Sequence, residues 1–146
     1  MRRSTSVCSL LLLTAGILLS ACASPPTPPE TLLAPDAEQA AAREMQSRSF
    51  DVADRTQAMR GVIAALQDLG FIIERANEPL GLVTAARFAE PSYQDMVGIT
   101  VTVQPDGSDK MRIRANVIFN NKPITDPKIY QNFFATLERS LFVGRN

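Results

Sequence analysis

The sequence predicts an α+β domain, in which an antiparallel sheet of four or five strands carries two helices packed on one face. Two observations support this prediction. Two amphipathic helical patterns flank a series of short alternating segments, and turn residues separate these segments from one another. Because two amphipathic helices must each cover an apolar surface, one antiparallel sheet can serve both and leave its other face in water. The expected element order is β-α-β-β-β-β-α.

The first 21 residues have the pattern of a secretory signal peptide. A basic start is followed by an apolar run from Val7 to Leu19, which is shorter than the roughly 20 residues of a membrane span. The run ends in Leu19-Ser20-Ala21-Cys22, and all four positions resemble the lipobox of bacterial lipoproteins. We expect cleavage between Ala21 and Cys22 and lipid attachment to the Cys22 thiol. A non-lipidated signal with a chance cysteine is the alternative.

Residues 22–48 are expected to form a tether between the lipid and a folded domain. Five of the ten prolines lie in residues 23–35, a composition that cannot pack a core, and residues 36–47 favour at most a loose helix. Ala23 follows the cysteine, instead of the aspartate that resembles an inner-membrane retention signal. We therefore expect a Gram-negative outer-membrane lipoprotein that faces the periplasm.

Residues 49–146 are expected to fold as a single α+β domain. A short strand is predicted over residues 49–52, and Asp54 can cap the helix that follows. The helix has one apolar stripe and ends at Gly70, where a glycine can adopt the left-handed conformation. The stripe consists of Met59, Val62, Ile63, Leu66 and Leu69.

Four further strands are predicted over residues 71–76, 80–88, 96–103 and 110–119. The last two form a hairpin, because Pro105-Asp106-Gly107-Ser108 has the composition of a turn. In the first of these two strands we expect Val97, Ile99, Val101 and Val103 to point one way and Thr100, Thr102 and Gln104 the other. In the second we expect Met111, Ile113, Ala115, Val117 and Phe119 to face inward and Lys110, Arg112, Arg114 and Asn116 to face outward. The segment 80–88 places Leu80, Leu82, Thr84, Ala86 and Phe88 together on one face.

The final helix is expected to begin at Asp126-Pro127, an N-cap followed by proline at the first helical position. Its apolar stripe comprises Ile129, Tyr130, Phe133, Phe134, Leu137 and Leu141. We expect Leu66 and Phe133 to pack from the two helices onto the same face of the sheet, near Val101 and Ile113.

The composition argues against most catalytic and metal-binding chemistry. The chain has no histidine, and its two cysteines are Cys8, which leaves with the signal, and Cys22, which receives lipid. The commonest general base, the commonest zinc ligand and the cysteine nucleophile are therefore missing from the mature domain. With 15 basic and 15 acidic residues, nothing indicates nucleic-acid binding. We expect no enzymatic activity, no metal and no cofactor.

One family resemblance can be stated. The segment Ala65-Leu66-Gln67-Asp68-Leu69-Gly70-Phe71-Ile72-Ile73, followed by Gly81-Leu82-Val83-Thr84-Ala85, resembles the helix-strand-strand core of BamC-type lipoprotein domains. The likeness covers residues 49–143 by element order. It implies a helix-grip α+β fold and membership of an outer-membrane assembly complex. This chain departs from that family by having one such domain instead of two and a shorter tail before it.

The outward face of the predicted hairpin is the first candidate site. Arg112 and Arg114, with Lys110, form a basic stripe beside Thr100 and Thr102. Such a face suits docking of an acidic partner or of lipid headgroups, although a solvated sheet surface gives the same pattern. The function that these residues favour is a non-catalytic accessory subunit of an outer-membrane or envelope complex.

The second candidate site is a crevice between the last helix and the sheet. Tyr130, Phe133 and Phe134 could line a pocket for an acyl chain, and the chain would then be a lipid- or small-hydrophobe-binding lipoprotein. At helical spacing, however, aromatic residues more often belong to the core. Tyr93, in a polar loop, is a weaker candidate for a partner anchor.

Overall fold

The structure, a computed structural model, describes residues 37–91 and 93–143. These residues belong to one compact unit, Pro35–Asn146. The predicted signal peptide, the predicted cleavage site at Ala21 and Cys22, and the proline-rich part of the predicted tether lie outside the described residues.

The described part of the chain forms three helices and six strands. In chain order these are α2 (Ala37–Met45), β1 (Ser47–Phe50), α3 (Arg55–Asp68), β2 (Ile72–Asn77), β3 (Leu82–Phe88), β4 (Met96–Pro105), β5 (Met111–Phe119), β6 (Lys122–Pro123) and α4 (Pro127–Val143). The predicted β-α-β-β-β-β-α order is present, with α2 and β6 added to it.

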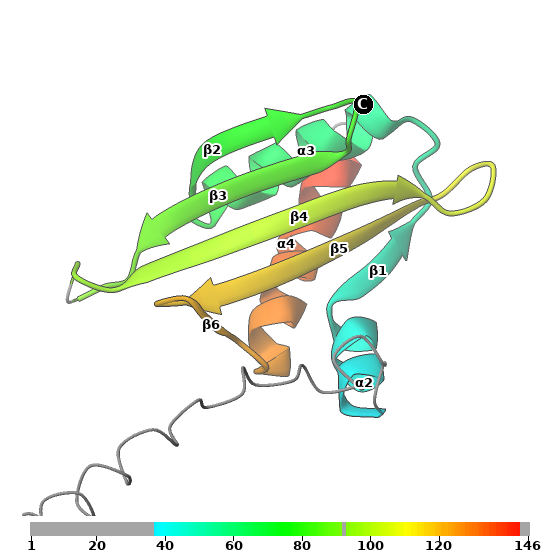
Figure 1. Ribbon diagram of the computed structural model, residues 1–146. Coiled ribbons are helices and arrows are strands. Elements are labelled where there is room, and N and C mark those ends of the chain that lie inside the picture. Colours follow the sequence, from blue (N-terminus) through cyan, green and yellow to red (C-terminus); the bar gives the residue numbers. More distant parts are fainter. Residues whose placement is uncertain (1–36, 92, 144–146) are drawn as a thin grey trace, which may run out of the picture. The chain divides into compact units, whose positions relative to one another are not determined.

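The six strands form one antiparallel sheet. Five of them lie in the order β1-β5-β4-β3-β2, and the short β6 pairs with β5 beside β1. Figure 1 looks onto one face of this sheet, with α3 and α4 behind the other face. The α+β prediction, with two helices on one side of an antiparallel sheet, is therefore confirmed. We call the side away from α3 and α4 the open face.

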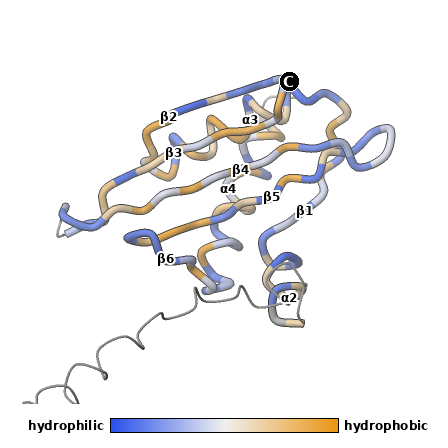
Figure 2. The backbone as a smooth tube through the Cα atoms, in the orientation of Figure 1, coloured by the Kyte–Doolittle hydropathy of each residue, from blue (hydrophilic) through white to orange (hydrophobic). Residues whose placement is uncertain are grey.

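The core lies between the sheet and the two covering helices. Alternate residues of β4 and β5 are buried there, and Leu66 and Phe133 contribute from the helices as expected. The largest fully buried side chains are Tyr130, Phe134, Leu66, Ile113, Leu137, Val62, Val83, Val101, Val103 and Val117. In Figure 2 the tubes of β4 and β5 alternate between apolar and polar colours, as a sheet with one buried face requires.

Both predicted helix starts are confirmed by their capping bonds. The Asp54 carboxylate accepts hydrogen bonds of 3.1 Å from the backbone N–H groups of Thr56 and Gln57. The Asp126 carboxylate accepts one of 2.9 Å from the N–H of Lys128. Each bond satisfies a donor that a helix start leaves without an intrahelical partner. Gly70, after α3, has a φ of +79°, as expected of its terminating position.

Four details of the strand predictions were wrong. The first strand, predicted over residues 49–52, is β1 and covers Ser47–Phe50 instead, because it pairs with Met111–Arg114 of β5. Leu80 lies in the turn before β3 and is 67% exposed. Phe119 is 39% exposed instead of facing inward, because it is the last residue of β5 and lies at a turn. That turn, Asn120-Asn121, has φ values of +46° and +64°. Two successive positive φ values make a tight hairpin, so β5 is followed directly by β6, a strand that was not predicted.

In the last helix, Ile129 departs from the predicted stripe. It is 37% exposed, whereas Tyr130 beside it is 1% exposed. Ile129 belongs to the first turn of α4. The buried side of α4 therefore begins at Tyr130 and continues through Phe133, Phe134, Leu137 and Leu141.

The segment expected to form a loose helix is well formed and lies against the domain. Helix α2 leads directly into β1 through Gln46, whose side chain is buried. The Gln46 backbone carbonyl accepts a 2.9 Å hydrogen bond from the N–H of Ala115 in β5. This bond extends the β1–β5 ladder by one residue and fixes α2 at the edge of the sheet.

Candidate functional site

The strand register gathers the predicted site residues on the open face. Thr102 of β4 lies opposite Arg114 of β5, and Arg114 lies opposite Ser47 of β1. In the next row, Gln104 lies opposite Arg112. The two arginines are exposed, while the threonines are half-buried. The structure therefore confirms that Arg112, Arg114, Thr100 and Thr102 share one surface.

These side chains line a shallow hollow of about 660 Å³, which we call the arginine hollow. Its lining residues are Arg43, Ser47, Thr100, Thr102, Gln104, Arg112, Arg114 and Asn116. They supply three guanidinium groups together with hydroxyl and amide groups, and no carboxylate. A surface with this composition can donate many hydrogen bonds to an anionic group, including the paired bonds of guanidinium with carboxylate.

Arg43 is the member of this hollow that sequence reasoning missed. It lies in the last turn of α2, within the segment that we expected to be a tether. Its charge reaches the open face because α2 is fixed next to β1 by Gln46. The only sequence signal was a basic residue in an Ala- and Glu-rich helical segment, and this signal does not indicate a position in space.

The three cations of the β5 stripe have different surroundings. The Arg112 guanidinium forms an ion pair of 2.6 Å with Asp106, in the turn between β4 and β5. The Arg114 guanidinium donates a 3.1 Å hydrogen bond to the side-chain oxygen of Gln46. Lys110 pairs with Asp51 at 3.2 Å, and this hydrogen-bonded carboxylate raises the pKa of the Lys110 amine.

These contacts decide which cations the hollow offers to a partner. Lys110 is not among the lining residues, so the predicted three-residue stripe reduces to Arg112 and Arg114. Arg114 is held by a neutral amide, which leaves its charge uncompensated. The charge of Arg112 is partly balanced by Asp106. Arg43 and Arg114 are thus the stronger candidates for binding an anionic group.

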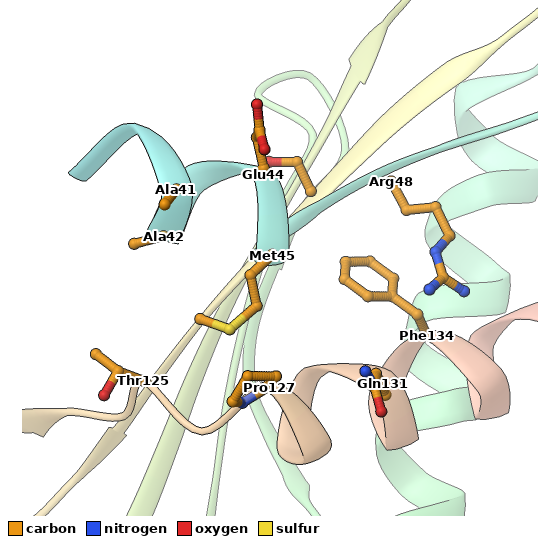
Figure 3. A pocket seen from close by; sticks show the side chains of 10 residues that line it. Ala41, Ala42, Glu44, Met45, Arg48, Thr125, Pro127, Gln131 and Phe134 are labelled. Atoms are coloured by element: carbon orange, nitrogen blue, oxygen red, sulfur yellow. The ribbon is translucent and has the colours of Figure 1, made fainter. Parts of the chain in front are cut away.

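A second hollow, of about 650 Å³, lies between α2 and the start of α4. Figure 3 shows it with Met45 of α2 above Pro127, and with the ring of Phe134 next to Arg48. The Arg48 guanidinium lies 5.0 Å from the centre of the Phe134 ring, an ordinary cation–π distance. The remaining lining residues are Ala41, Ala42, Glu44, Ser47, Thr125 and Gln131.

The proposed crevice between α4 and the sheet is filled by the residues that would have lined it. Tyr130, Phe133 and Phe134 are each 1–2% exposed and belong to the hydrophobic core. The ring centres of Phe133 and Phe134 lie 5.1 Å apart in an edge-to-face arrangement, typical of packed aromatic pairs. Tyr93, the other weak candidate, is 64% exposed and has a φ of +51°.

Two properties of the described residues bear on other classes of site. No cluster of three or more metal-ligating side chains occurs in them. None of the helices that the structure describes is long and apolar enough to cross a membrane.

Comparisons with known proteins identify no family. No protein-family model matches the chain, and no curated protein is significantly similar to it.

Proposed function

We propose that this chain is a periplasm-facing lipoprotein, anchored by lipid on Cys22, that serves as a non-catalytic accessory subunit of an outer-membrane or envelope complex. In this proposal the domain is of the helix-grip type, and the open face binds an acidic protein partner. The lipobox-like sequence supports the anchor. The two long helices on one face of an antiparallel sheet, and the resemblance to BamC-type domains, support the fold type.

The arginine hollow is the observation that most directly supports the binding role. Arg43, Arg112 and Arg114 come from two elements far apart in the sequence and line one surface without a carboxylate among its lining residues. Exposed guanidinium groups at a protein interface can pair with carboxylates on the partner and determine which partner binds. The sheet surface beside these arginines is flat, and its half-buried threonines offer further hydrogen-bonding groups to a partner.

A lipid- or small-hydrophobe-binding role is the second candidate. Its original site, the crevice between α4 and the sheet, is filled by aromatic side chains. The hollow between α2 and α4 takes its place in this alternative, because Ala41, Ala42, Met45, Pro127 and Phe134 give it apolar walls. Saturable binding of a fluorescent fatty acid, lost in Met45→Glu, would favour this alternative.

The test of the proposed function compares two double variants of the full lipidated protein. Arg112→Ala with Arg114→Ala removes two charges from the arginine hollow, and Arg60→Ala with Arg139→Ala removes two exposed charges from the helical layer. After crosslinking in membranes, we expect the first variant to lose at least about nine-tenths of its main partner, a loss of about 1.4 kcal/mol or more in binding. The control should keep its partner.

Ionic strength supplies an independent readout. Binding through exposed charge pairs weakens as salt rises, because counterions screen them over about 8–10 Å. We expect partner recovery by the unmodified protein to fall between low and high salt before crosslinking. If both double variants recover the same partner at the same yield, the arginine hollow is a solvated surface and the proposed function is wrong.

A further inference from the structure

The open face also carries an apolar row at the end away from the arginines. Four residues that lie opposite one another across β2, β3, β4 and β5 are Ile72, Ala86, Gly98 and Ile118. We call this set the apolar row. A side chain added to Gly98 would contact Ile118, since a Cβ there would lie 3.1 Å from Ile118 Cγ1. The isoleucine therefore lies over the glycine and makes this part of the face flat.

Two large side chains adjoin this row on the same face. Phe88 of β3 lies opposite Met96 of β4, and both alternate with the core-facing residues of their strands. Phe88 is 59% exposed, Met96 is 51% exposed, and Ile72 in the apolar row is 70% exposed. Clustered exposure of large apolar side chains is unusual on a monomer surface and marks an interaction site.

The distance between the two ends of the open face follows from the strands. Along β5, Ile118 of the apolar row is separated from Arg114 by four residues, which corresponds to about 13 Å. The intervening row contains Thr100 and Asn116, which lie opposite each other. The face thus passes from apolar to neutral polar to basic within the span of one short peptide segment.

We infer that the occupant of the open face is an amphipathic segment of the acidic partner, with apolar side chains at one end and carboxylates at the other. This inference rests on the proposed function and adds the chemistry of the partner's binding segment. Charge complementarity supports it, because the arginine hollow needs carboxylates about 13 Å from the apolar row along the strand direction. An extended strand or a short helix can satisfy both ends at once.

A second copy of this chain would be a poor binding partner for the open face. Two open faces could pack with their strand ends matched or reversed. In the first arrangement guanidinium groups would face guanidinium groups, and in the second they would face the apolar row. Both arrangements bury the guanidinium groups of Arg43 and Arg114 without a carboxylate from the second copy, which is costly.

Photo-crosslinking can test both ends of the face on one strand. A benzoylphenylalanine residue replaces either Met96, next to the apolar row, or Gln104, in the arginine hollow, in the full lipidated protein. Both positions are exposed on the open face of β4. The same replacement at Arg60, exposed on α3, is the control. After irradiation in cells, mass spectrometry identifies the crosslinked peptide.

We expect Met96 and Gln104 to crosslink to one foreign polypeptide, within about 20 residues of each other in its sequence, and Arg60 not to do so. The peptide bound at Met96 should be apolar and the peptide bound at Gln104 should contain Asp or Glu. Crosslinks from Met96 to phospholipid, to another copy of this chain or to a different polypeptide would overturn the inference. If only Gln104 captures an acidic protein, the inference fails and the proposed function stands.

A matched pair of variants measures the contribution of the apolar end. Ile72→Ser with Phe88→Ser changes two open-face residues, and Leu80→Ser with Phe142→Ser changes two others of similar exposure, 67% and 56%. We expect the first variant to reduce recovery of the Gln104-crosslinked partner at least tenfold, and the second to leave it unchanged. Equal recovery in both variants, with unfolding midpoints unchanged, would overturn the inference.

Discussion

The side-chain nitrogen of Gln46 donates a hydrogen bond of 3.4 Å to the hydroxyl of Tyr130, 84 residues away in the sequence. The same hydroxyl donates to the carbonyl of Ile124 at 2.8 Å and accepts from the N–H of Val117 at 3.4 Å. These bonds satisfy backbone groups of β5 and of the connection after β6, in the gap between β1 and β6. Gln46 also holds Arg114, so one buried amide joins the sheet edge to the arginine hollow.

Removal of this hydroxyl should therefore cost stability without creating a large cavity. We expect Tyr130→Phe to lower the free energy of unfolding by about 1–3 kcal/mol, because the Gln46 amide, the Val117 N–H and the Ile124 carbonyl each lose a partner. Chemical denaturation monitored by circular dichroism measures this change. Tyr93→Phe is the control, since Tyr93 is 64% exposed, and its change should stay below about 0.5 kcal/mol. Equal effects of the two substitutions would contradict the role assigned to Tyr130.

The aromatic core offers a second stability test. Phe133 is 2% exposed and belongs to the same core cluster as Leu66, Val101 and Ile113. We expect Phe133→Ala to lower the free energy of unfolding by about 3–5 kcal/mol, through lost burial and the cavity left behind. Phe142→Ala, at a residue 56% exposed, should cost much less. A loss below about 1 kcal/mol for Phe133→Ala would contradict the packing of α4.

Much of this fold follows from local sequence patterns. Alternation predicted the core-facing side of β4 and β5, and the capping residues Asp54 and Asp126 predicted both long helices. The four candidate residues of the hairpin, including Arg112 and Arg114, came together because an antiparallel hairpin of known register brings them together. Local periodicity and turn chemistry are sufficient for such features.

The remaining features depend on contacts between distant residues. Nothing near Gln46 in the sequence indicates that its amide is buried by Tyr130, and without that contact neither the position of α2 nor that of Arg43 can be predicted. The pairing of β1 with β5 likewise joins segments that are far apart in the sequence, so local patterns do not predict it. Periodicity had placed Leu82, Thr84, Ala86 and Phe88 on one face, but only the pairing of β3 with β4 shows that this face is the open one.

Gly81 is a position where the backbone requires glycine. Its φ is +61°, and a Cβ there would overlap the carbonyl oxygen of Val103. Its own carbonyl accepts a 2.7 Å hydrogen bond from the N–H of Val103. Gly107→Ala is the matched control, since Gly107 has a φ of +87° with open space around it.

Both alanine substitutions should incur the cost of a left-handed residue, about 1–2 kcal/mol. We expect Gly81→Ala to destabilise the domain further, by at least about 1 kcal/mol, because the overlap also breaks the hydrogen bond. Thermal unfolding of the two variants side by side measures the difference. If the unfolding midpoints of the two variants fall by the same amount, this would contradict the close approach of the Gly81 backbone to Val103 in β4.

The two arginines that β5 contributes to the arginine hollow should differ in their effect on stability. Arg112 pairs with Asp106 at the surface, and its side chain is 58% exposed, so Arg112→Ala should change the free energy of unfolding by less than about 0.5 kcal/mol. Arg114→Ala removes a partner from the buried Gln46 and should cost about 1 kcal/mol. Denaturation of the single variants tests this order, and a larger loss for Arg112→Ala would contradict it.

Lipid attachment is the prediction on which the proposed location depends. In our proposal the thiol of Cys22 receives the lipid, because Cys22 ends the lipobox-like sequence Leu19-Ser20-Ala21-Cys22, and a serine hydroxyl is a much weaker nucleophile than a thiolate. We therefore expect Cys22→Ser to yield no acylated product, as measured by intact-mass spectrometry of the membrane fraction.

Cys8→Ser is the matched control: this cysteine lies in the predicted signal peptide, so the mature product should keep the acylated mass of the unmodified protein. The acylated protein should fractionate with outer-membrane markers. An acylated product of the Cys22→Ser protein, differing in mass from the unmodified acylated protein only by the exchange of sulfur for oxygen, would show that the lipid is attached elsewhere. Fractionation with the inner membrane would contradict the location inferred from Ala23.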